Sequence, residues 1–284
     1  MNRIGRILCA VDFSPESHAA AEYAATLSRR LAVPMALLHS HHVPAMAAYG
    51  RAAAPDWDVW LPGPADERNE LDLWVAEFCA SGLEVTSLFV EGAPAGALAR
   101  NTEPGDLLVI GAHARGDVER SLLGSSAERI VRHAHCPTIV VPADCRRRAI
   151  ATIVVATDFS PASFHAVRFA CAFAGSLGAS VRAVHVVHEE HLKYDEHFEV
   201  PEYIPGMVEA ATVDLKAALA DCPGVQASVR TGIPSREIVE AAEHANADLI
   251  AIGLHGHNPI EAAMLGSTAN RVLRHAPCPV LVTR

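Results

Sequence analysis

The chain has 284 residues, half of them apolar and a fifth charged, which is typical of globular domains and excludes collagen-like or disordered chains. Its formal charge of −10 has the wrong sign for a protein held on nucleic acid by the phosphates, so we expect no nucleic-acid partner. The N-terminus lacks the features of a signal peptide, and no window approaches the roughly 18 uncharged apolar residues of a membrane helix. We therefore expect no membrane partner. The seven cysteines form no C-x-x-C pair, which indicates reduced thiols and a cytoplasmic protein.

The sequence contains an internal duplication. The segment AVDFSP at 10–15 returns as ATDFSP at 156–161, and GSSAER at 124–129 returns as GSTANR at 266–271. A repeat of this length predicts two domains rather than a solenoid of short units. We place them at residues 1–143 and 149–284, with a linker in the charged stretch between them.

Short β-branched and apolar runs alternate with segments of helical period, which predicts β-α-β units and a parallel sheet in each half. Each expected helix after a first strand begins with Ser-Pro, at 14–15 and 160–161, where Ser caps the helix and Pro fits its first position. Five strands are expected in each half. In the first half they are Arg6–Val11, Met35–Ser40, Val85–Val90, Leu107–Ile110 and Thr138–Val141, and in the second Ile153–Ala156, Ser180–Val187, Gln226–Arg230, Leu249–Ile252 and Val280–Thr283.

A glycine pattern follows the fourth expected strand of the second half. Gly253 and Gly256 could let the backbone turn sharply and approach a ligand without a Cβ in the way. Gly266 and Ser267 open a helix whose N–H groups would point outward at its positive end. This arrangement favours binding of an anion, most naturally phosphate.

Asp158 ends the first strand of the same half. Open parallel sheets bind ligands beyond the carboxyl ends of their strands, where a carboxylate can accept hydrogen bonds from an exocyclic amine or a ribose hydroxyl. The alternative is that Asp158 simply caps the helix that follows. The residues alone leave both interpretations open.

At these residues the chain resembles the universal stress protein family, over almost its whole length and as a tandem member. In that family the spacing glycine, two residues, glycine, nine residues, glycine, Ser or Thr marks ATP binders, and the second half matches it. The resemblance also implies that Asp158 contacts adenine or ribose, and that Val186 contacts adenine through its main chain. Together with polar contacts near the phosphates, the predicted site comprises Asp158, Val186, Gly253, His255, Gly256, His257, Gly266, Ser267 and Thr268.

The first half departs from the pattern at one position, where Ala114 stands in place of the second glycine. The resemblance therefore supports ATP in the second half more than in the first. The second, weaker candidate site comprises Asp12, Ser40, Gly111, Ala114, Gly124, Ser125 and Ser126.

The resemblance implies two Rossmann-like α/β domains, each a five-stranded parallel sheet flanked by helices, packed as an internal pseudo-dimer. Single-domain relatives are typically dimers, and here one chain would supply both halves. The last strand of each half is the expected pairing edge, because an unpaired apolar edge favours aggregation. Formation of a homodimer of whole chains stays open.

We therefore predict an adenine-nucleotide-binding stress-response protein that senses rather than catalyses, with ATP or another adenylate as its ligand. No P-loop motif occurs, and no carboxylate cluster marks a Mg²⁺ site, although Mg²⁺ could accompany ATP. Occupancy would change the loop at 188–205 and thereby a surface for a protein partner not identified by the sequence. Two alternatives remain: a weak ATPase or nucleotide transferase using Glu261 or a histidine, and a scaffold that binds no nucleotide.

Sixteen histidines also raise a metal site as an alternative. His39, His41 and His42 end one expected strand, and His185, His188 and His191 occupy the matching place. Alternate residues of a strand point to opposite faces, so only His39 and His41 share a side within the first group. We predict no metal site.

Overall fold

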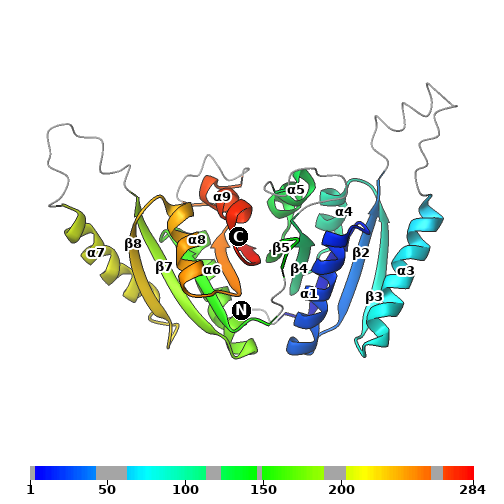
Figure 1. The fold of residues 1–284 in the computed structure, drawn as a ribbon, viewed down its shortest axis with the longest axis horizontal. Helices are drawn as coiled ribbons and strands as arrows, with labels where there is room; N and C mark the ends of the chain where they lie inside the picture. The colour runs from blue at the N-terminus through cyan, green and yellow to red at the C-terminus, as the bar shows by residue number, and fades with distance from the viewer. Residues whose placement is uncertain (1–3, 43–62, 113–122, 146–148, 189–202, 257–264) are drawn as a thin grey trace, which may run out of the picture.

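The computed structural model describes residues 4–42, 63–112, 123–145, 149–188, 203–256 and 265–284 (Figure 1). The first half contains β1 (Arg6–Val11), α1 (Pro15–Leu31), β2 (Met35–His41), α3 (Pro64–Ala80), β3 (Val85–Glu91), α4 (Pro94–Asn101), β4 (Asp106–Gly111), α5 (Ser125–His133) and β5 (Thr138–Val141). The second contains β6 (Thr152–Thr157), α6 (Pro161–Leu177), β7 (Ser180–His188), α7 (Tyr203–Ala218), β8 (Gln226–Gly232), α8 (Pro234–His244), β9 (Leu249–Gly253), α9 (Ser267–His275) and β10 (Val280–Thr283). None of the helices in these ranges is long and apolar enough to cross a membrane.

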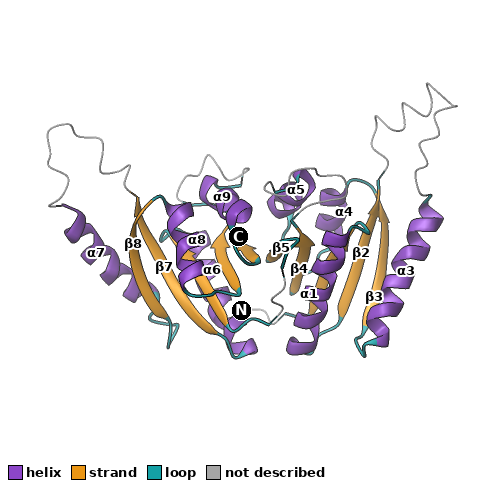
Figure 2. Ribbon diagram, viewed as in Figure 1, coloured by secondary structure: helices purple, strands orange, loops and turns teal. Residues whose placement is uncertain are grey.

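The described strands form one ten-stranded sheet in the order β3-β2-β1-β4-β5-β10-β9-β6-β7-β8 (Figure 2). Neighbouring strands run parallel, except that β5 and β10 pair antiparallel with Ile139 opposite Leu281. The expected count of five strands in each half is confirmed, and the last strands are the pairing edges. The bounds of β1, β5 and β10 match the prediction, whereas the other strands extend one or two residues further.

The helix after the first strand of each half begins as the sequence predicts. The Ser14 hydroxyl accepts a hydrogen bond from the Ser17 N–H at 3.1 Å, and the Ser160 hydroxyl accepts one from the Ser163 N–H at 3.2 Å. Proline follows each cap, at a position that needs no donor. A cap of this kind contributes about 1 kcal/mol to helix stability.

Two layers of helices cover the sheet, one on each face (Figure 2). In β1, Ile7 and Cys9 belong to one buried core and Leu8 to the other, as the alternation of a strand requires. The first core includes side chains of α1, α3, α6 and α7, and the second includes side chains of α4, α5, α8 and α9. Each core contains residues from both halves, so the chain is one packed body rather than two loosely linked ones.

A hydrogen-bonded contact joins the halves on the α1 and α6 side. The Arg30 guanidinium, at the C-terminal end of α1, donates to the Ile150 carbonyl at 3.0 Å and to the Leu177 carbonyl at 2.5 Å. Leu177 is the last residue of α6, and the carbonyl groups of the last turn of a helix lack partners within that helix. Arg30 of the first half therefore supplies a hydrogen-bond donor to a carbonyl group at the C-terminal end of α6 in the second half.

Leu281→Ala tests the contribution of the central strand pair. Leu281 is fully buried in β10, so its truncation should lower the free energy of unfolding by about 2–5 kcal/mol. The matched control is Leu73→Ala, because Leu73 is 69% exposed on α3 and should lose at most about 0.5 kcal/mol. Urea unfolding of both variants measures the difference, and equal losses would contradict the central position of β10.

Candidate functional site

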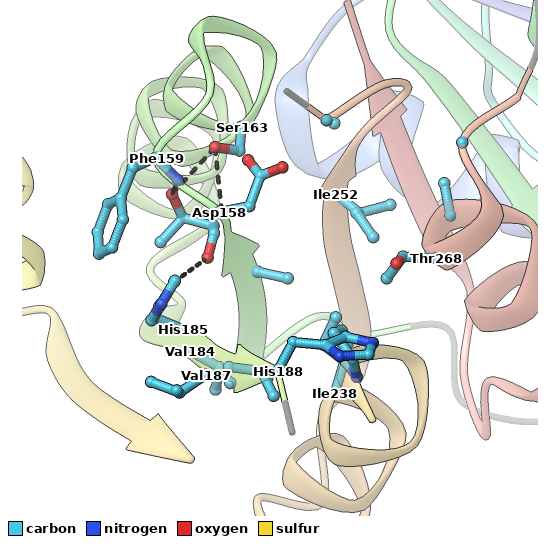
Figure 3. A pocket seen from close by; sticks show the side chains of 18 of the residues that line it. Asp158, Phe159, Ser163, Val184, His185, Val187, His188, Ile238, Ile252 and Thr268 are labelled. Atoms are coloured by element: carbon cyan, nitrogen blue, oxygen red, sulfur yellow. Dashed lines mark hydrogen bonds between the residues drawn. The ribbon is translucent and has the colours of Figure 1, made fainter. Parts of the chain in front are cut away.

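A cleft of about 610 Å³ lies at the carboxyl ends of β6, β7 and β9 (Figure 3). We call it the second-half cleft. Its volume falls within the range of roughly 300–1,000 Å³ that is usual for small-molecule sites. Eight of the nine predicted residues line it, and His257 lies outside the described residues: the eight are Asp158, Val186, Gly253, His255, Gly256, Gly266, Ser267 and Thr268.

Asp158 both holds a turn and lines the second-half cleft. Its Oδ1 accepts a hydrogen bond from the Ser160 N–H at 3.0 Å. The next residue, Phe159, has a φ of 65°, a left-handed conformation that costs a non-glycine residue roughly 1–2 kcal/mol. The cap of α6 is Ser160, not Asp158, so the carboxylate supports the turn while facing the cleft (Figure 3).

The glycines of the pattern make close contacts with protein atoms. A Cβ on Gly253 would lie 3.0 Å from the Ala162 carbonyl carbon and the Ser163 nitrogen, at the start of α6. A Cβ on Gly266 would lie 3.2 Å from the Leu254 carbonyl oxygen. Neither Gly253 nor Gly266 has a left-handed backbone, so a positive φ is not the reason for glycine at either position. Close backbone packing, of β9 against the start of α6 and of Gly266 against Leu254, is what favours glycine at these positions.

Gly256 differs from these two because it faces a side chain. A Cβ built there would lie 2.6 Å from Oδ2 of Asp158. Its backbone is not left-handed either. The absence of a side chain at Gly256 therefore leaves room for the Asp158 carboxylate, which would have to shift if a larger residue stood there.

The N-terminus of α9 faces the second-half cleft without a side-chain cap. Gly266 occupies the cap position and offers no side-chain oxygen, in contrast to Ser160 at the start of α6. Ser267, Thr268 and Ala269 form the first turn, and all three line the cleft. Backbone N–H groups at such an end carry a partial positive charge and suit an anion.

The first half has a smaller counterpart of about 100 Å³, which we call the first-half hollow. Asp12, Ser40, Gly111 and Ser126 line it, whereas Gly124 and Ser125 begin α5 without lining it. Ala114 lies outside the described residues. The volume is below that of usual small-molecule sites.

The histidines of β2 and β7 have structural partners. Nδ1 of His39 donates to the Val11 carbonyl and Nδ1 of His185 donates to the Thr157 carbonyl, both at 2.9 Å. His39 and His41 share a side as expected, and both contact Oε2 of Glu67 in α3, at 3.0 and 2.6 Å. His191 and residues 189–202 lie outside the described ranges, and among the residues within them no group of three side chains could hold a metal ion.

One side of the second-half cleft is formed by α7, which was not predicted to belong to the site. Met207, Ala210, Ala211 and Asp214 of α7 line it, at the spacing i, i+3, i+4, i+7 that marks one face of a helix. That spacing was present in the sequence, but an apolar helical face ordinarily indicates core packing. Pro234 and Ile238 of α8 line the cleft as well.

Comparison with known proteins settles the family. The model of the universal stress protein family matches residues 3–142 and again residues 150–284. The chain belongs to the universal stress protein family. Its resemblance to tandem members is thereby confirmed.

Family members that span the whole chain and members that span about half of it both match. Universal stress protein Rv2005c of Mycobacterium tuberculosis is 28% identical over 299 residues, covering 98% of this chain and 96% of that protein. Universal stress protein MJ0531 of Methanocaldococcus jannaschii is 36% identical over 138 residues, covering 46% of this chain and 81% of that protein. A universal stress protein structure from Archaeoglobus fulgidus matches with a TM-score of 0.68 at 20% identity, covering 98% and 97% of the two chains, which confirms the fold.

Gly253→Ala and Gly256→Ala separate the two kinds of glycine. At Gly253 the added methyl meets backbone atoms that cannot rotate away, so the free energy of unfolding should fall by about 1–3 kcal/mol. At Gly256 it meets a carboxylate that can rotate, so the change should stay within about 0.5 kcal/mol. Thermal unfolding of both variants checks this, and a greater loss at Gly256 would contradict the assignment.

Proposed function

We propose that this universal stress protein binds an adenine nucleotide, ATP or another adenylate, in the second-half cleft. One observation carries the proposal: an uncapped helix N-terminus and a strand-end carboxylate face the same cleft of about 610 Å³. The helix end suits the phosphates, and Asp158 suits a ribose hydroxyl or the exocyclic amine of the base. The glycine spacing, which resembles that of the family's ATP binders, supports the same ligand.

A regulatory role fits this cleft better than phosphoryl transfer. Among its described lining residues there is neither lysine nor arginine, the groups that neutralise charge as a phosphoryl group leaves. Mg²⁺ would arrive with the phosphates rather than on a protein site, since the described residues contain no cluster for it. Binding would act on a protein partner through the surface near β7, whose following residues, 189–202, lie outside the described ranges.

The first half is proposed to hold no nucleotide. Its hollow of about 100 Å³ is too small for an adenylate, although α5 begins with the same uncapped Gly-Ser as α9. One nucleotide per chain is the expected stoichiometry. Nucleotide released from the freshly purified, denatured protein would favour a binder, and its absence together with no binding in solution would favour the scaffold alternative.

Asp158→Ala and Asp12→Ala form a matched pair for the binding test. Each carboxylate accepts a hydrogen bond from the N–H of the following Ser, at 3.0 Å for Asp158 and 3.1 Å for Asp12. Asp12 also accepts a hydrogen bond from the Ser14 hydroxyl at 2.5 Å, so its loss should cost at least as much stability as that of Asp158. Only Asp158→Ala should weaken ATP binding, by roughly 10- to 100-fold for a hydrogen bond to a charged group. Isothermal titration calorimetry measures both, and equal affinities in the two variants would sink the site assignment.

A further inference from the structure

The second-half cleft extends to both faces of the sheet. Val184, Ile238 and Ile252 line it on the face covered by α8 and α9, where they belong to one core. Phe159, packed against the other core, lines it on the face covered by α6 and α7. Figure 3 shows the corresponding separation, with Phe159 beside His185 and away from Ile252. We call the second part the α7 lobe, lined by Phe159, His185, Val187, Met207, Ala210 and Ala211.

The first half shows what closes this lobe. Leu71 of α3 and Leu215 of α7 are both buried in the same core, so we take them as equivalent positions of the two halves. Ala211, four residues before Leu215, then corresponds to Glu67, four residues before Leu71. In the first half the Glu67 carboxylate fills the space beside β2 and contacts two histidines. In the second half a methyl group stands there, and Val187 stands in place of His41.

His185 presents one nitrogen to the α7 lobe. Its ring stacks on Phe159 with centroids 4.3 Å apart, and the His39 ring stacks on Phe13 at 4.4 Å. Since each Nδ1 also donates to a strand carbonyl at 2.9 Å, the two rings have the same orientation. In the first half Nε2 meets Glu67, so Nε2 of His185 faces the position of Ala211.

The chemistry of the lobe follows from this orientation. A carbonyl oxygen only accepts hydrogen bonds, so Nδ1 of His185 carries the proton and Nε2 of the neutral ring is an acceptor. Its surroundings in the lobe are the apolar side chains of Val187, Met207 and Ala211. An acceptor in such surroundings gains from a ligand donor, and the carboxylate of Asp214, on the same face of α7, disfavours an anion.

We propose that the α7 lobe binds a neutral aromatic amine or alcohol, with its N–H or O–H donated to Nε2 of His185 and its ring against Met207 and Ala211. A nucleotide bound at the N-terminus of α9 would lie on the opposite face of the sheet, so the two ligands would bind independently. The inference does not rest on the proposed nucleotide function.

N-phenyl-1-naphthylamine, a neutral fluorophore with a single N–H group, is the probe. The full chain should bind one molecule with enhanced fluorescence. Ala211→Glu and Ala211→Leu should each weaken binding about tenfold or more, since both fill the lobe. The matched control is Ala217→Glu, on the exposed side of the same helix, which should bind as the wild type does. 1-Phenylnaphthalene, which lacks the N–H group, should compete about tenfold more weakly.

Saturating ATP distinguishes this lobe from the nucleotide site. The probe should remain bound in its presence, and it should bind equally if the protein proves to have no affinity for ATP. Absence of probe binding to the wild type, equal loss in Ala217→Glu, or stoichiometric displacement by ATP would each overturn the proposal. In the last case the base of the nucleotide, rather than a second ligand, would occupy the α7 lobe.

Discussion

The antiparallel pairing of β5 and β10 is the interaction on which the rest of the structure depends. Both strands are four residues long and buried throughout. Separated, each would expose a row of unpaired backbone groups beside apolar side chains, which is the template for aggregation. Pairing converts two five-stranded sheets into one, and places residues of both halves in each of the two cores.

Features that recur in both halves turn out to serve the backbone. The strand-end Asp, the left-handed Phe, the Ser cap and the His that stacks on the Phe are present in each copy with nearly the same geometry. They hold a strained turn at the end of β1 and of β6. Recurrence therefore identifies what the turn requires, and it does not by itself identify a ligand that both halves share.

Much of the fold was predictable because its signals are local. Short β-branched and apolar runs between segments of helical period predicted all ten strands, and Ser-Pro predicted the start of α1 and α6. The packing role of Gly253 could not be predicted, because the sequence does not show that the backbone of Ala162 lies 3.0 Å from its missing Cβ. The α7 wall was missed for a related reason, since an apolar helical face has the same spacing whether it covers a core or a cleft. The difference between Ala114 and Gly256 stays a prediction, as Ala114 is outside the described residues.

The two halves also differ in a charged residue beside the second strand of each half, a difference that lies outside the glycine pattern. In the first half Glu67 joins α3 to β2 through His39 and His41, and no residue of α3 lines the first-half hollow. In the second half Ala211 makes no such bond, and one face of α7 lines the cleft. The Glu67 carboxylate is partly buried, so its contacts with the two histidines offset lost hydration and join the helix to the strand. The methyl group of Ala211 needs no polar partner, so α7 can leave space beside His185. The two copies of the fold thus carry a hollow of about 100 Å³ and a cleft of about 610 Å³, and Glu67 against Ala211 is one difference between them.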